Sequence, residues 1–90
     1  MKNDDCLNIV VRPADGGFAV ELRGPDKACE TYLSHRDLDR LYETDFLVTE
    51  DGWLVRFCGP DVVLKRTGVC GYTAADDWWR LLVAAETARR

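Results

Sequence analysis

The sequence GFAVELRGPD at residues 17–26 returns as GWLVRFCGPD at residues 52–61. Both stretches read glycine, an aromatic residue, any residue, valine, any residue, a large apolar residue, any residue and then Gly-Pro-Asp. They align without a gap at a constant offset of 35 residues (53 − 18 = 35). Self-similarity of this kind within one chain indicates a repeated supersecondary unit.

Alternating apolar residues on both sides of the first copy predict a β-hairpin. The alternation surrounds a turn at residues 13–17 and comprises Leu7, Ile9 and Val11, then Phe18, Val20 and Leu22. A period of two residues is typical of a strand with one buried face. Gly24-Pro25-Asp26 predicts a second reversal of the chain, because glycine and proline favour turn geometry. A third strand is expected over residues 28–33.

A helix is predicted to follow this third strand. Ser34 stands three residues before Asp37, which is the spacing of a capping box with Asp in the place of the usual Glu or Gln. Leu38, Leu41 and Tyr42 then follow at helical spacing.

The second half of the chain repeats this order. Strands are expected at residues 46–49, 53–57 and 62–67, with turns at 50–52 and 59–61. A weaker echo matches residues 38–42 with residues 78–82, at an offset of 40, and we assign the extra residues to a loop at 68–72. Thr73 is expected to cap a second helix whose apolar stripe comprises Trp78, Leu81, Leu82 and Ala85.

These patterns predict an α+β fold, a tandem βββα pseudo-repeat with an antiparallel sheet or sheets and two helices. The 90 residues form a single domain, with units of about 6–43 and 46–88, because half of this length is too short to bury a stable core alone. The shared core is expected around Phe18, Leu22, Leu41, Trp53, Phe57, Trp78 and Leu81.

Composition and motifs argue against several classes of function. No apolar run approaches the roughly 18 residues of a membrane span, and residues 1–5 do not read as a signal peptide, so we expect a cytoplasmic protein. In that reducing compartment the four cysteines stay thiols: Cys6, Cys29, Cys58 and Cys70. No Cys-x-x-Cys pair is present, and His35 is the only histidine, which argues against a metal or other cofactor.

We also expect no enzymatic activity, since no nucleotide, metalloprotease or nucleophile motif is found. Cys29 and Cys58 fall in predicted strands, where a free cysteine is commonly a small buried hydrophobe. The alternative is a thiol switch at Cys58 or Cys70, although no activating base stands beside either residue.

The acidic charge is concentrated in the middle of the chain. The net charge is −4, and residues 30–51 carry seven acids against Arg36 and Arg40, a local balance of −5. The acids expected to contact a partner are Asp37, Asp39, Glu43, Asp45, Glu50 and Asp51. Such a surface repels nucleic acid and attracts a protein with a basic, nucleic-acid-binding surface. The alternative is a solvated face that keeps the protein soluble.

Trp79 and Val83 lie to one side of the apolar stripe of the second helix. Two interpretations remain open. Either the partner sheet covers them, or they form an exposed apolar anchor for another protein or a second copy, since aromatic residues are enriched in interface hot spots. The second interpretation includes a structural or regulatory homodimer held by Trp79, Val83 and free sheet edges. The chain is therefore expected to be a monomer or a homodimer.

The repeated Gly-aromatic-x-Val-x-apolar strand and the capped helix resemble the YegP-type repeat proteins of bacteria. A three-stranded sheet with a helix is also similar to the plant ethylene-response-factor DNA-binding domain, but the arginine-rich strands of that domain are missing here. In size and acidity the chain resembles phage-encoded inhibitors, including anti-CRISPR proteins. That resemblance implies a non-enzymatic module that mimics nucleic acid and inhibits a bacterial defence complex. A small nucleic-acid-associated regulator is the remaining alternative.

Overall fold

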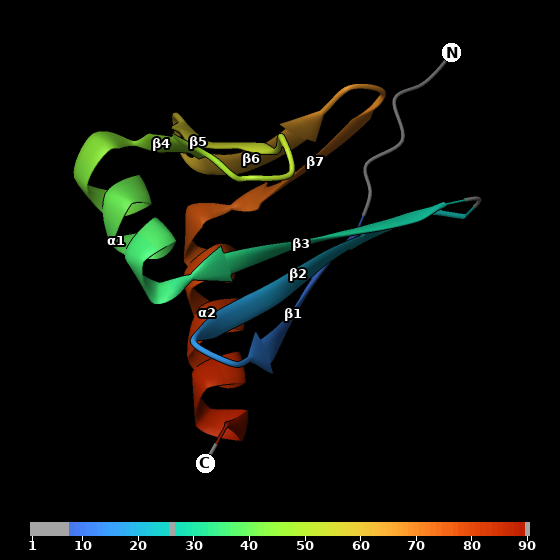
Figure 1. Ribbon diagram of the computed structural model, residues 1–90. Coiled ribbons are helices and arrows are strands. Elements are labelled where there is room, and N and C mark those ends of the chain that lie inside the picture. Colours follow the sequence, from blue (N-terminus) through green and yellow to red (C-terminus); the bar gives the residue numbers. More distant parts are fainter. Residues whose placement is uncertain (1–7, 26, 90) are drawn as a thin grey trace.

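The computed structural model describes residues 8–25 and 27–89 and has an α+β fold with two antiparallel sheets and two helices (Figure 1). The elements follow in the order β1 (Asn8–Ala14), β2 (Gly17–Arg23), β3 (Ala28–Ser34), α1 (His35–Thr44), β4 (Phe46–Val48), β5 (Leu54–Cys58), β6 (Asp61–Arg66), β7 (Val69–Ala74) and α2 (Ala75–Ala88). Cys6, the predicted strand start at Leu7 and the turn residue Asp26 lie outside the described residues.

The first sheet, β1–β2–β3, is the meander predicted for the first unit. Phe18, Val20 and Leu22 of β2 are buried, as their alternation indicates. Gly17 opens β2 at a close approach to β3: a Cβ atom built there would lie 2.2 Å from the carbonyl oxygen of Leu33. Only glycine fits at this position without displacing the backbone of the neighbouring strand.

The second sheet, β4–β5–β6–β7, has one strand more than predicted. The predicted loop at residues 68–72 is wrong, because β7 pairs with β6 from Val69 opposite Arg66 to Ala74 opposite Asp61. Gly68 has a φ of 80°, a left-handed conformation that lets Thr67 and Gly68 close a two-residue turn. The residues that lengthen the second unit therefore form a strand, and this unit is ββββα.

The two helices begin differently. Ser34 caps α1: its side chain accepts a hydrogen bond from the backbone N–H of Asp37, whose carboxylate accepts one from the N–H of Ser34, both at 3.0 Å. The predicted cap at Thr73 is wrong, since β7 continues to Ala74 and α2 begins without a side-chain cap. The N–H of Ala75 donates instead to the carbonyl oxygen of Pro60, at 2.8 Å.

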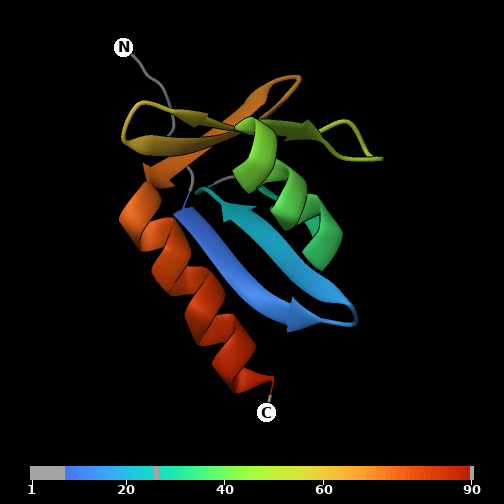
Figure 2. The same cartoon turned by 90° about the vertical axis from the view of Figure 1, so that its left-hand side faces the viewer.

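Each helix contacts both sheets, so the two units share one hydrophobic core. Helix α1 packs on β3 and β4, and α2 packs on β1, β6 and β7, with both helices on the same side of the first sheet (Figures 1 and 2). Five predicted core residues are buried: Phe18, Leu22, Leu41, Trp53 and Trp78. Phe57 and Leu81 are only partly buried, whereas Leu82 of the predicted stripe is buried.

No helix in residues 8–25 and 27–89 is long and apolar enough to cross a membrane.

Candidate functional site

Most of the large apolar side chains that the fold leaves exposed lie in two places. Tyr42, Trp79 and Val83 gather where α1 and α2 face each other, whereas Phe46 and Val48 of β4 and Tyr72 of β7 belong to the second sheet. All three residues of the first group line one mostly apolar concave surface, which makes this group the stronger candidate for a binding site.

The concave surface is a groove of about 260 Å³ between the two helices, called here the helix-pair groove. Its apolar lining comprises Phe18, Leu38, Tyr42, Trp79, Leu82 and Val83. The polar groups in the lining are His35, Asp39 and Glu86. The groove thus combines an apolar floor with two carboxylates.

Trp79 is 57% exposed, so the sheet does not cover it and the exposed alternative for this residue holds in the single chain. Its indole meets the ring of Tyr42 edge to face, with 6.1 Å between the ring centroids. The ring of Tyr42 in turn contacts that of Phe57, with 5.1 Å between centroids. Burial raises the pKa of the Tyr42 hydroxyl, which therefore stays protonated at neutral pH. The row of three rings orients the indole of Trp79 while leaving it open to solvent.

The polar side of the groove is held by contacts between the two helices. His35 of α1 and Glu86 of α2 lie 3.2 Å apart, between Nε2 and Oε1. The hydrogen bond with His35 is the main cause that lowers the pKa of Glu86, and the charge of Arg89 adds to it. Glu86 therefore remains a carboxylate well into the acid range.

Arg89 fixes the end of α2 against the β1–β2 turn. Its guanidinium donates to the carbonyl oxygens of Ala14 and Gly17, both at 2.6 Å, and lies over the ring of Phe18. The guanidinium also contacts Glu86, at 3.1 Å. One end of the helix-pair groove is therefore anchored to the first sheet by the Arg89 guanidinium.

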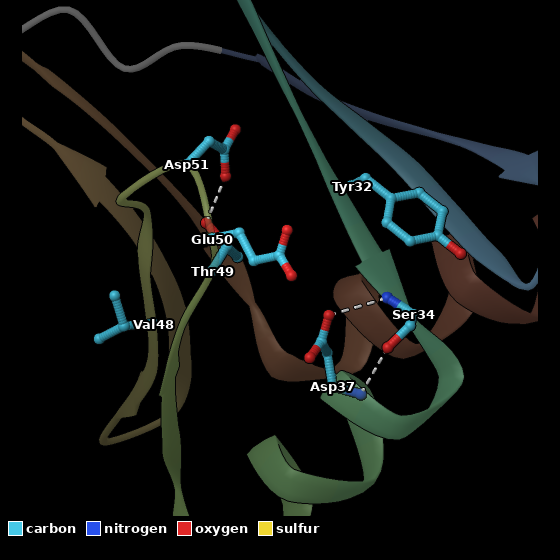
Figure 3. Close-up of a pocket in the computed structure, with 7 residues that line it drawn as sticks. All are labelled: Tyr32, Ser34, Asp37, Val48, Thr49, Glu50 and Asp51. Carbon is cyan, nitrogen blue, oxygen red and sulfur yellow. Dashed lines mark hydrogen bonds between the residues drawn. The ribbon is translucent and has the colours of Figure 1, made fainter.

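The predicted acidic residues do not form one surface. Asp37, Glu50 and Asp51 line a second depression, between the start of α1 and the β4–β5 turn, together with Tyr32, Ser34, Val48 and Thr49 (Figure 3). Asp37 is engaged in the helix cap. Burial raises the pKa of Asp51, but hydrogen bonds from Thr49, Thr31 and its own backbone, with the charge of Arg66, outweigh it and lower the pKa overall. Two of these three carboxylates are thus committed to local structure.

The other predicted acids lie elsewhere. Asp39, which also borders the helix-pair groove, and Glu43 lie on the outer side of α1 with Arg36 and Arg40. Helical spacing interleaves these four side chains, so this side is close to neutral. Asp45 ends α1 in a left-handed conformation with a φ of 70°. Counting charge along the chain therefore overestimated the acidity of any one face.

Sequence reasoning missed His35, Tyr42 and Glu86 as neighbours of Trp79 and Val83. His35 and Glu86 are 51 residues apart, and no local pattern links them. Helical spacing does place Glu86 on the same side of α2 as Trp79 and Val83, which was the available signal.

The three cysteines that the structure describes offer no comparable site. Cys29 is half-buried against the core, whereas Cys58 and Cys70 are exposed thiols. Within the described part of the chain, no three His, Cys, Asp or Glu residues come together as metal ligands.

Comparison with known proteins adds no relative from which a role could be transferred. The resemblances noted in the sequence remain predictions, and function has to be inferred from the surface of the molecule. No protein-family model, curated protein or solved structure matches this chain.

Proposed function

We propose that this protein is a non-enzymatic binding module whose helix-pair groove takes an apolar segment of a partner protein that also carries basic residues. The observation that supports the proposal most directly is Trp79, a 57% exposed indole held by Tyr42 at the mouth of an apolar groove. A tryptophan in this setting has the properties of an interface hot spot, because it offers a large apolar area on a rigid side chain.

The shape of the groove favours a partner helix. Two roughly facing helices present Leu38, Leu82 and Val83 as a floor on which the apolar side of an amphipathic helix can lie. Asp39 and Glu86 then stand where lysine or arginine side chains of the partner could reach them. The basic partner expected from the sequence is thus retained, with the contact moved from the whole acidic segment to this groove.

Nucleic-acid mimicry has weaker geometric support than recognition of a partner segment. A mimic needs carboxylates spread along one face, whereas here they lie on several sides of α1 and beside Arg36 and Arg40. Inhibition of a defence complex remains compatible with the groove if that complex presents a basic, apolar segment.

Tryptophan fluorescence tests the proposal, since Trp53 and Trp78 are fully buried and Trp79 is the exposed indole. The probe is a synthetic amphipathic helical peptide with leucine on one face and lysine on the other. We expect this peptide to shift the emission to the blue and to protect Trp79 from acrylamide quenching, with weaker binding at high salt. The same peptide with glutamate in place of lysine should bind much less.

Two variants locate the contact on α2. Val83→Asp places a carboxylate in the groove and should weaken peptide binding at least tenfold, whereas Ala84→Asp adds the same group on an exposed position outside the groove lining and should leave binding unchanged. Unaltered quenching with both peptides, or equal loss in the two variants, would refute the proposal.

A further inference from the structure

The second group of exposed apolar residues lies on the face of the second sheet opposite to the buried Leu47, Val55 and Leu64. The helices lie on the other side of this sheet (Figure 1). The strand register arranges its side chains in two rows across the sheet. One row is Phe46, Arg56, Val63 and Tyr72, and the next is Val48, Leu54, Lys65 and Cys70. We call these eight residues the outer sheet face.

This face is unusually apolar for a surface open to water. Phe46 is 53% exposed, Val48 63% and Tyr72 51%. No helix or strand of the described chain lies over them (Figures 1 and 2). The corresponding face of the first sheet is instead covered by charged pairs, Arg12 with Glu30 and Arg23 with Glu21. An exposed apolar patch with a polar border is typical of a protein interface.

The charges on the outer sheet face have no salt-bridge partner among residues 8–25 and 27–89. Neither row contains an acid, and neither Arg56 nor Lys65 makes a salt bridge with a described residue, although Asp45 borders the same depression as Arg56. On the other side of the Phe46 row, the neighbouring row contains Asp61, which stands between Cys58 of β5 and Ala74 of β7 in the strand register. The face thus carries a cation in each of two rows and a carboxylate one row away, and none of the three forms a salt bridge within the described part of the chain.

We propose that the outer sheet face packs against the same face of a second copy of this chain. The two-fold axis runs along the strands, between β5 and β6, so that β4 lies over β7 of the second copy and β5 lies over β6. Two such sheets pack with their strands nearly aligned, as in a β-sandwich. A two-fold contact uses one patch twice and closes the assembly at a dimer.

This arrangement brings the exposed aromatic rings together and gives Arg56 an acid within reach. Each Phe46 comes to lie on Tyr72 of the second copy, which forms two aromatic contacts across the interface. Each Arg56 comes to lie one row from Asp61 of the second copy, about 7 Å along the strand, which an arginine side chain can span. An axis across the strands would place β4 on β4 and β7 on β7, and would never bring Phe46 over Tyr72.

The size of the face predicts a weak dimer. Four strands about 4.8 Å apart and about 15–20 Å long make a surface of a few hundred square ångströms. A standard interface buries about 800 Å² on each partner. Association is therefore expected at micromolar concentrations or above, and the helix-pair groove stays open because it lies on the other side of the second sheet.

Analytical ultracentrifugation of the full chain, from micromolar to submillimolar concentration, tests the proposal. We expect a concentration-dependent dimer for the natural sequence. Arg56→Asp and Asp61→Arg should each weaken the dimer at least tenfold by opposing like charges, and the double variant should recover it by exchanging the charges. Phe46→Lys should remove it independently of Asp61.

The matched control is Arg12→Asp, a charge reversal on the outer face of the first sheet, which should leave the dimer unchanged. Circular dichroism establishes that each variant is folded. A strict monomer at all concentrations, a dimer that resists Arg56→Asp, or a dimer lost in Trp79→Ala alone would overturn the proposal. Peptide binding in the helix-pair groove is measured separately, so failure of one proposal does not decide the other.

Discussion

The two units of the pseudo-repeat are alike on the inside and different on the outside. Phe18, Val20 and Leu22 of β2 correspond to Trp53, Val55 and Phe57, and all of them face the core. The outward residues do not correspond in kind: Glu21, for example, is matched by Arg56. Burial constrains every second residue of a strand and leaves the others free to differ. The distinctive surfaces of this protein therefore lie where the repeat breaks down.

The repeated glycine shows that one sequence position can be required for two different reasons. At Gly17 the backbone of β3 leaves no room for a side chain. Gly52 has nothing within 4 Å of a Cβ atom built there, but its φ of 88° disfavours any other residue. Glycine is thus required for close packing in the first unit and for turn geometry in the second.

Alanine at the equivalent aromatic positions gives the largest predicted effect and tests whether the units contribute equally to the core. Phe18→Ala and Trp53→Ala should each lower the free energy of unfolding by about 3–5 kcal/mol, since both side chains are buried. Urea denaturation measures the change. A small loss at one position and a large loss at the other would break the equivalence.

A milder variant keeps this test informative if the alanine variants do not fold. The indole N–H of Trp53 is buried and finds no acceptor among the described residues. Trp53→Phe removes this N–H and retains most of the ring, so we expect a loss below about 2 kcal/mol.

Variants at the starts of α1 and α2 compare the two units further, with effects on stability of intermediate size. Ser34→Ala removes the capping box of α1 and should cost about 1 kcal/mol in the free energy of unfolding. Thr73→Val removes only a hydroxyl that caps nothing in α2, and it should change stability by no more than a few tenths of a kcal/mol. Urea midpoints of the two variants check this difference. Equal losses would mean that α2 is capped by Thr73 in solution.

The smallest predicted effect concerns Asp51, which joins the two units. In the repeat it occupies the position of Gly16, and it accepts a hydrogen bond from Thr31 of β3 at 2.9 Å. Its pKa is lowered below the ordinary value of 3.8 in the folded state. The carboxylate therefore contributes stability above that value, and the contribution is lost as the pH falls through the folded pKa.

We expect Asp51→Asn to reduce stability at neutral pH by less than about 1 kcal/mol, because the side chain is largely solvated. The difference between the variant and the natural protein should shrink below pH 3.8. Urea midpoints measured across the acid range check this prediction. A difference that grows on acidification would show that the carboxylate is not stabilised by its neighbours.

Residue patterns sufficed for the parts of this molecule that depend on near neighbours. The hairpin of β1 and β2, the α1 cap and the buried sides of β2 and β5 follow from alternation, turn residues and side chains three positions apart. Strand β7 could not be found in this way, because Gly68 and Gly71 are residues typical of loops and the strand is ordered by pairing with β6.

Tertiary packing alone decided which polar and aromatic groups share a surface. It separated the acids of residues 30–51 onto several sides, joined His35 to Glu86 across 51 residues, and left Trp79 open beside Tyr42. The physical reason is that the direction of a side chain depends on how helices and sheets are placed relative to one another. That placement comes from the single core that both units must build together.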